Sequence, residues 1–117
     1  MLLNLSMTQS KTGVFYLSVF QFDGVTPQSL VGSTLWFHAA FSNFAINKSS
    51  PSSGITIQNT AGGANCATLQ IEPADTTALT LATGSVVMPC ELTLQSGSEE
   101  YELARGSLSV QANVGTP

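Results

Sequence analysis

The chain has 117 residues, of which 43% are apolar and only 9% are charged, against about 25% charged in an average soluble protein. Its net charge of −4 and its three basic residues argue against nucleic-acid binding, because neutralising phosphates requires clustered lysine and arginine. No apolar run approaches the roughly 20 residues of a membrane-spanning helix, and disorder would require lower hydrophobicity with higher net charge.

The length is that of one domain, which we place at residues 1–117. A surface of hydroxyls, amides and apolar atoms has few charges to desolvate, and the cores of protein interfaces are depleted in charge. The composition therefore favours a protein that lives inside an assembly; a secreted, neutral β domain is the alternative. The first residues lack the basic region and the cleavage site of a signal peptide, so we expect synthesis and use in a cytoplasm.

Short apolar stretches recur between clusters of Gly, Ser, Pro and Asn, which is typical of a β-sandwich or a barrel. Pro73 suits the first position of a helical turn, so one such turn is expected after it, with Leu79 packing underneath. Turns are expected at 23–24 and 62–63, a loop at 47–54, a hairpin loop at 96–99 and a frayed tail at 113–117. The expected strands are 2–7, 13–22, 33–44, 55–59, 66–71, 86–95 and 100–111.

The alternation of side chains along these strands predicts which of them face the core. Trp36 and His38 fall on the opposite side of their strand from Phe37. Pro89 cannot donate to a ladder, so it marks a sheet edge or a bulge. Seven or eight short strands favour an all-β, two-layer sandwich. The residues expected in its core are Leu35, Phe37, Leu69, Ile71, Leu92, Leu94, Leu108 and Val110.

The N-terminal segment 1–7 is expected to be an arm or an edge strand. Its leucines, Leu2, Leu3 and Leu5, are the candidate interface residues, because an isolated apolar chain start of this kind normally frays. Added to the sheet edge of another subunit, the segment would satisfy its backbone groups and hide its side chains. We expect deletion of residues 1–6 to leave the sandwich folded but to weaken incorporation of the chain into its assembly.

No residue is predicted to be catalytic, to bind a cofactor or to ligate a metal. His38 is the only histidine, so no metal site can draw two imidazoles from one chain, and on an outer strand face we expect it to be a polar partner or an interface residue. Glu99, Glu100 and Glu102 cluster at a hairpin turn, where a solvated acidic tip is the ordinary interpretation. We therefore expect no enzymatic activity.

The two cysteines are 24 residues apart, a spacing that invites a disulfide between sheets. Cys66 lies three residues before Leu69, so its side chain falls on the opposite, outward face of the strand. Cys90 lies two residues before Leu92, so its side chain falls on the same, inward face. A disulfide needs side chains that face each other, so two free thiols are expected. A bulge beside Pro89 would shift this parity by one residue.

Four motifs are more specific than the rest of the sequence. In chain order they are Gly32-Ser33-Thr34-Leu35-Trp36-Phe37, Gly54-Ile55-Thr56-Ile57, Pro73-Ala74-Asp75-Thr76-Thr77-Ala78-Leu79 and Tyr101-Glu102-Leu103-Ala104-Arg105-Gly106-Ser107-Leu108-Ser109-Val110. With these motifs in this order, the chain resembles, over about residues 14–112, a class of small tailed-phage proteins that are similar to the N-terminal domain of phage baseplate upper proteins. It departs from the class at His38-Ala39-Ala40-Phe41, where members commonly have a charged strand, and at Val86-Val87-Met88-Pro89-Cys90, where they often have an aromatic one.

The resemblance implies an immunoglobulin-like sandwich and a role as a virion structural protein. This protein would be a capsid-decorating, a neck or a baseplate subunit. The implied partners are other phage structural proteins and further copies of the chain, with no membrane and no nucleic acid. A different class of function, a carbohydrate-binding module, would place Tyr16, Trp36 and Tyr101 on one exposed face to stack on sugars.

Overall fold

The computed structural model describes residues 2–19, 30, 32–41, 44–50, 53–58, 66–77 and 84–112. Within these ranges it contains eight strands and one short helix. In chain order they are β1 (Leu2–Thr8), β2 (Gly13–Ser18), β3 (Thr34–Phe41), β4 (Phe44–Ser49), β5 (Ile55–Gln58), β6 (Cys66–Ile71), α1 (Pro73–Thr76), β7 (Ser85–Ser96) and β8 (Glu99–Gln111).

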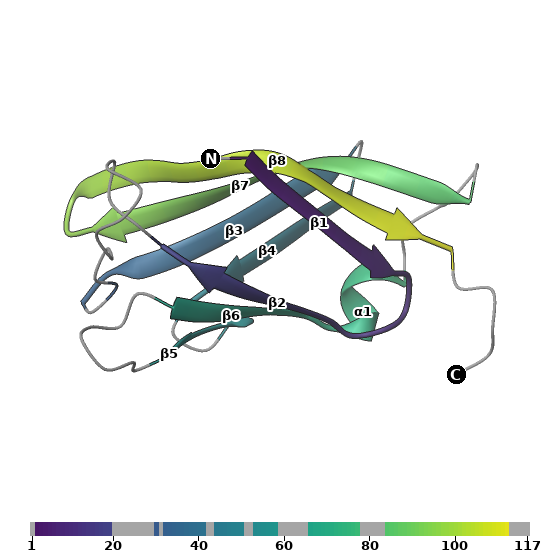
Figure 1. Cartoon of the computed structure of the whole chain (residues 1–117), viewed down its shortest axis with the longest axis horizontal. Coiled ribbons are helices and arrows are strands. Elements are labelled where there is room, and N and C mark those ends of the chain that lie inside the picture. Colours follow the sequence, from purple (N-terminus) through teal and green to yellow (C-terminus); the bar gives the residue numbers. More distant parts are fainter. Residues whose placement is uncertain are drawn as a thin grey trace.

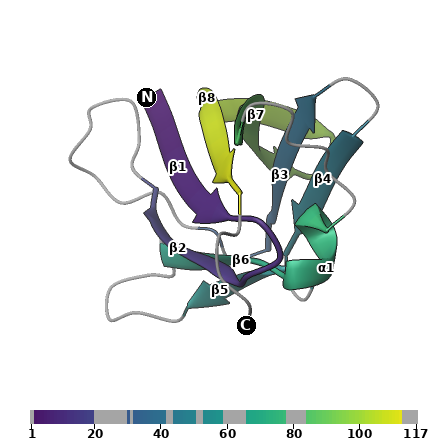
Figure 2. The same cartoon turned by 90° about the vertical axis from the view of Figure 1, so that its right-hand side faces the viewer.

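The strands form two sheets that face each other, as the two views of Figures 1 and 2 show. One sheet has the order β1-β8-β7-β3-β4 and the other β2-β6-β5. β1 runs parallel to β8, and all the other pairs of strands are antiparallel. With β2 to β8 taken as strands B, C, C′, D, E, F and G, this is the order of a variable-type immunoglobulin sandwich. The predicted all-β, immunoglobulin-like, two-layer sandwich is confirmed.

The core lies between the sheets and is made by alternate residues of the facing strands. On β3, Leu35, Phe37 and Ala39 are buried, whereas Trp36 and His38 are exposed. This is the period of two that a strand imposes when one face is covered. The eight predicted core residues are all buried, at 0–4% exposure: Leu35, Phe37, Leu69, Ile71, Leu92, Leu94, Leu108 and Val110.

The interruption of strand pairing lies away from Pro89. The register of β7 with β8 shifts between Leu92 and Thr93, where Leu103 is the extra residue on β8. Pro89 itself pairs in register with Ser107, and the ladder between β7 and β3 begins only at the next residue, Cys90. At Pro89, β7 is therefore paired with β8 but not with β3. A proline fits such an edge position because it has no N–H to donate to a ladder.

Residues 44–49 were expected to be the end of one strand and the beginning of a loop, and this prediction is wrong. They form β4, which pairs antiparallel with β3 from Phe41↔Phe44 to Trp36↔Ser49. Ser50, the residue that follows β4, is buried and joins the end of this strand to β3. Its Oγ accepts a hydrogen bond from Leu35 N (2.8 Å), and its own N donates one to Leu35 O (2.9 Å). The turns predicted at 23–24 and 62–63, the packing of Leu79 and the tail 113–117 fall outside the described residues.

Candidate functional site

The N-terminal strand is part of the chain's own sandwich. Leu3 and Met7 are 7% and 8% exposed, and Leu5 packs, partly buried, against the same core. The segment was expected to fray in the isolated chain, but Leu3 is buried there, because pairing with β8 turns every second side chain of β1 inward. The side chain of Leu2 lies outside the described residues, and a contact between segment 1–7 and another subunit stays a prediction.

Gly106 sets the position of β1. Its partners in the ladders are Leu3 on β1 and Cys90 on β7. A Cβ at residue 106 would overlap the carbonyl oxygen of Leu3 and lie 2.6 Å from its carbonyl carbon. Real Cβ atoms essentially never come so close to another heavy atom, so β1 can lie here only because residue 106 has no side chain.

The other end of β1 is fixed by the turn that follows it. Ser10 N donates to Thr76 Oγ1 (2.9 Å), and the Gln9 side-chain amide donates to Thr76 O (3.1 Å). Thr76 is fully buried in α1, the helical turn that the sequence predicts after Pro73. β1 is thus paired with β8 along its whole length, and the turn that follows it is anchored to α1.

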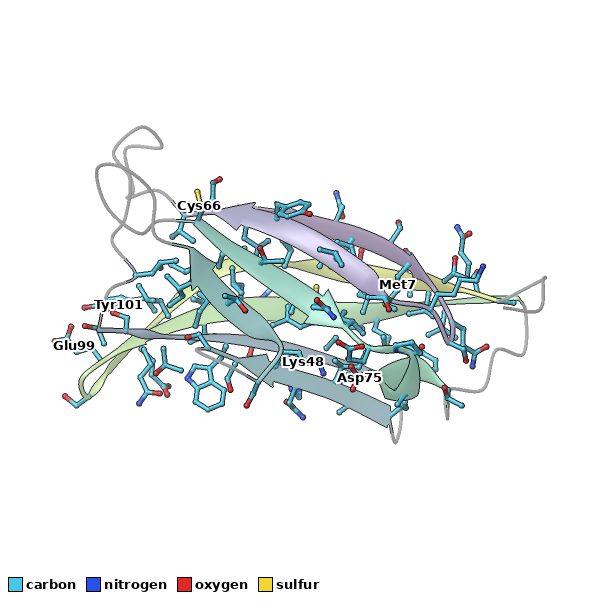
Figure 3. The ribbon with its side chains drawn as sticks, turned by 90° about the horizontal axis from the view of Figure 1, so that it is seen from below. Met7, Lys48, Cys66, Asp75, Glu99 and Tyr101 are labelled. Atoms are coloured by element: carbon cyan, nitrogen blue, oxygen red, sulfur yellow. The ribbon has the colours of Figure 1, made fainter. Side chains whose placement is uncertain are left out.

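The edge strand β4 carries an inward-pointing charge. Lys48 pairs with the buried Phe37 and so faces the space between the sheets, where its amine lies 2.6 Å from Asp75 Oδ2 of α1 (Figure 3). The same Asp75 oxygen accepts a hydrogen bond from Glu72 N (2.7 Å). An inward-pointing charge on an edge strand is a known device against edge-to-edge pairing, because a strand added there would bury it further. The sequence interpretation missed this residue, although Lys48 lies two residues after the apolar Ile46 and so falls on the same face of the strand.

The outward side chains that the structure describes on the three strands β2, β6 and β5 are all uncharged. Tyr16 is the most exposed apolar side chain of this face at 79%, and Val14 is 42% exposed. The register aligns Tyr16 with Thr68 and Thr56 across the sheet. The outward residues described on it are Val14, Tyr16, Ser18, Thr56, Cys66, Thr68 and Gln70.

The outer face of the five-stranded sheet carries a small group of charges. Arg105 Nη2 lies 2.6 Å from Glu102 Oε1 and 3.7 Å from Glu91 Oε2. The hydrogen bond and the charge of Glu102, with the charge of Glu91, raise the pKa of Arg105. His38 shares this face and hydrogen-bonds through Nδ1 to Asn47 Oδ1, so it is a polar partner, as expected. A shallow depression of about 240 Å³ lies among them, lined by His38, Ala40, Pro89, Cys90, Glu91 and Arg105.

The aromatic residues considered for sugar stacking lie on three different surfaces. Tyr16 is on the outer face of the three-stranded sheet, and Trp36 is on that of the five-stranded sheet, where its Nε1 donates to Gln95 Oε1 (3.0 Å). Tyr101 is at the β7–β8 hairpin end beside Glu99 (Figure 3), whose hydrogen bond and charge raise the pKa of the phenol. No single platform brings these three rings together.

The two cysteines do not form a disulfide, and they face different environments. Cys66 is partly exposed at the start of β6 (Figure 3), and its sulfur lies 3.7 Å from the Ser18 hydroxyl. Cys90 is 4% exposed in the core, and burial raises the pKa of its thiol. The parity argument from the sequence correctly separated them.

Within the described ranges, no three His, Cys, Asp or Glu side chains lie together as a metal site would require. Among the same residues no helix is long and apolar enough to cross a membrane.

No protein-family model matches the chain, and no curated protein does. Solved structures match at low similarity. The N-terminal domain of phage TP901-1 ORF48 is 8% identical with a TM-score of 0.47, and the match covers 97% of this chain and 85% of that one. Murine CRIg is 10% identical with a TM-score of 0.40, covering 94% and 92%.

Proposed function

We propose that the chain is a structural subunit of a bacteriophage virion, without catalytic activity, that acts through contacts with other virion proteins and with copies of itself. The motifs that resemble the tailed-phage class support the virion context. They fall on described elements of the sandwich: on β3, on β5, on α1 and on β8. We interpret them as signatures of the fold and not of catalysis.

The observation that carries protein binding is the distribution of charge. Among the described residues, the outward side chains of the three-stranded sheet carry no charge, from Val14 and Tyr16 on β2 to Thr56 on β5, and Glu72, just past the end of β6, hydrogen-bonds to Gln70 at the margin of this face. Such a face loses little hydration free energy when a partner covers it, as in the charge-depleted centres of interfaces. Within the virion, a capsid-decorating, a neck or a baseplate subunit would each use such a face to bind its partners.

The test is to purify the phage particles through a density gradient and to detect the chain by mass spectrometry and by gold-labelled antibody. We expect it to co-purify with particles and to label one part of the virion, which also assigns that part. A chain found in the infected-cell lysate but absent from purified particles would contradict the proposal.

A further inference from the structure

The edge of β1 that faces away from β8 is not paired with any other strand in the described part of the chain. β1 ends the five-stranded sheet, and among the described strands only β8 pairs with it. In a ladder, each strand directs about half of its backbone N–H and C=O groups to either side. The groups of β1 that point away from β8 form a seven-residue edge that an added strand can satisfy.

The other edges of the sandwich are less suited to pairing. β4 has the inward Lys48, held by Asp75, and β5 is only four residues long. Short strands and inward charges are the means by which natural sheets protect their edges. β1 and β2 contain no charge and no proline, and of the two β1 is the longer and extends the larger sheet.

The side-chain pattern of β1 is complementary to itself. Leu3, Leu5 and Met7 face the core, and Asn4 and Ser6 are exposed on the outer face. Two copies related by a two-fold axis bring identical edges together antiparallel. With Leu5 opposite Leu5 of the second copy, Asn4 lies opposite Ser6 at both ends of the pair. Each apolar side chain then stays on the core side, and the neutral amide and hydroxyl groups can hydrogen-bond across the strands.

We propose that the chain forms a two-fold dimer through antiparallel pairing of β1 with β1 of a second copy, which joins the two five-stranded sheets into one. This deepens the proposed function by naming a contact between subunits, and it rests on that function only for its biological setting. The contact consists of backbone hydrogen bonds and neutral side chains, so its dissociation constant is nearly independent of salt.

Two double variants that change the same two residues test the contact. Asn4→Lys with Ser6→Lys places lysine opposite lysine twice across the pair, whereas Asn4→Glu with Ser6→Lys places glutamate opposite lysine twice. Both positions are exposed, and their neighbours on β8 are Ser107 and Ser109, so both variants keep the sandwich intact. Thermal unfolding followed by circular dichroism checks this for each protein.

Analytical ultracentrifugation of the full chain over a range of concentrations then gives the dimer dissociation constants. We expect a dimer for the wild type and for the Glu/Lys variant, and dimerisation weaker by about tenfold or more for the Lys/Lys variant. A wild type that stays monomeric overturns the inference, as do equal dissociation constants for the two variants. Either result leaves the co-purification test of the virion role unaffected.

Discussion

Gly106 on β8 lies so close to Leu3 on β1 that the carbonyl group of Leu3 occupies the space where a side chain at residue 106 would begin. Substitution by alanine must therefore move β1. We expect Gly106→Ala to lower the free energy of unfolding by about 1–3 kcal/mol, the usual cost of overpacking. Urea denaturation measures it, with Ser107→Ala as the control, for which a change within about 0.5 kcal/mol is expected. Equal stability of the two variants would show that β1 is not held at this point.

Leu69 is fully buried at the centre of β6, between β2 and β5. We expect Leu69→Ala to destabilise the fold by about 2–5 kcal/mol, because it removes apolar burial and leaves a cavity. The matched control is Thr56→Ala on the exposed face of the same sheet, with an expected change within about 0.5 kcal/mol. An unchanged melting temperature for Leu69→Ala would place the core on the other face of β6.

The thiols should differ in reactivity. The thiolate is the reactive form, and burial raises the pKa of Cys90, so less of it is ionised at a given pH and reagent reaches it poorly. We expect Cys66 to be labelled first by a thiol reagent in the native protein, with Cys66→Ser and Cys90→Ser variants assigning the two rates. The intact mass should not change on reduction. A gain of two hydrogens would reveal a disulfide and refute the two-thiol account.

Lys48 points inward on the edge strand β4 and pairs with Asp75 of α1. Lys48→Met keeps most of the side-chain stem but loses the ion pair with Asp75, which is largely covered (side-chain exposures 13% and 27%). We expect a loss of about 1–3 kcal/mol, between the values for exposed and buried pairs, and more light scattering at high concentration. Lys11→Met, which makes the same change of net charge at an exposed turn residue, is the control. If both variants scatter equally, the edge needs no protection by Lys48.

The sequence predicts the strands and the core well because both follow from local alternation. Leu35, Phe37 and the two cysteines were placed on the correct sides by parity alone. The position of β1 did not follow from the sequence, because parallel pairing with β8 joins residues about 100 apart and depends on the absence of a side chain at Gly106. With Leu3 in the core, deletion of residues 1–6 is now expected to destabilise the sandwich, contrary to the expectation from sequence.

The β4 strand was missed because Asn, Lys and Ser at 47–50 are typical of loops. Only the tertiary contacts explain them: Lys48 reaches Asp75, and Ser50 bonds to the backbone of Leu35. The aromatic residues show the same limit. Parity places Trp36 outward, but the separation of Tyr16, Trp36 and Tyr101 onto three surfaces depends on which strand lies in which sheet.

If the chain is a virion subunit held by uncharged contacts, it should stay bound to purified particles as the ionic strength rises. Charge–charge attraction is screened beyond about 3 Å at 1 M salt, whereas apolar burial and neutral hydrogen bonds persist. We predict that the amount of chain per particle, measured by quantitative mass spectrometry after sedimentation, stays constant up to about 1 M salt. Release of the chain at moderate salt, or its absence from particles at any salt, would contradict the account.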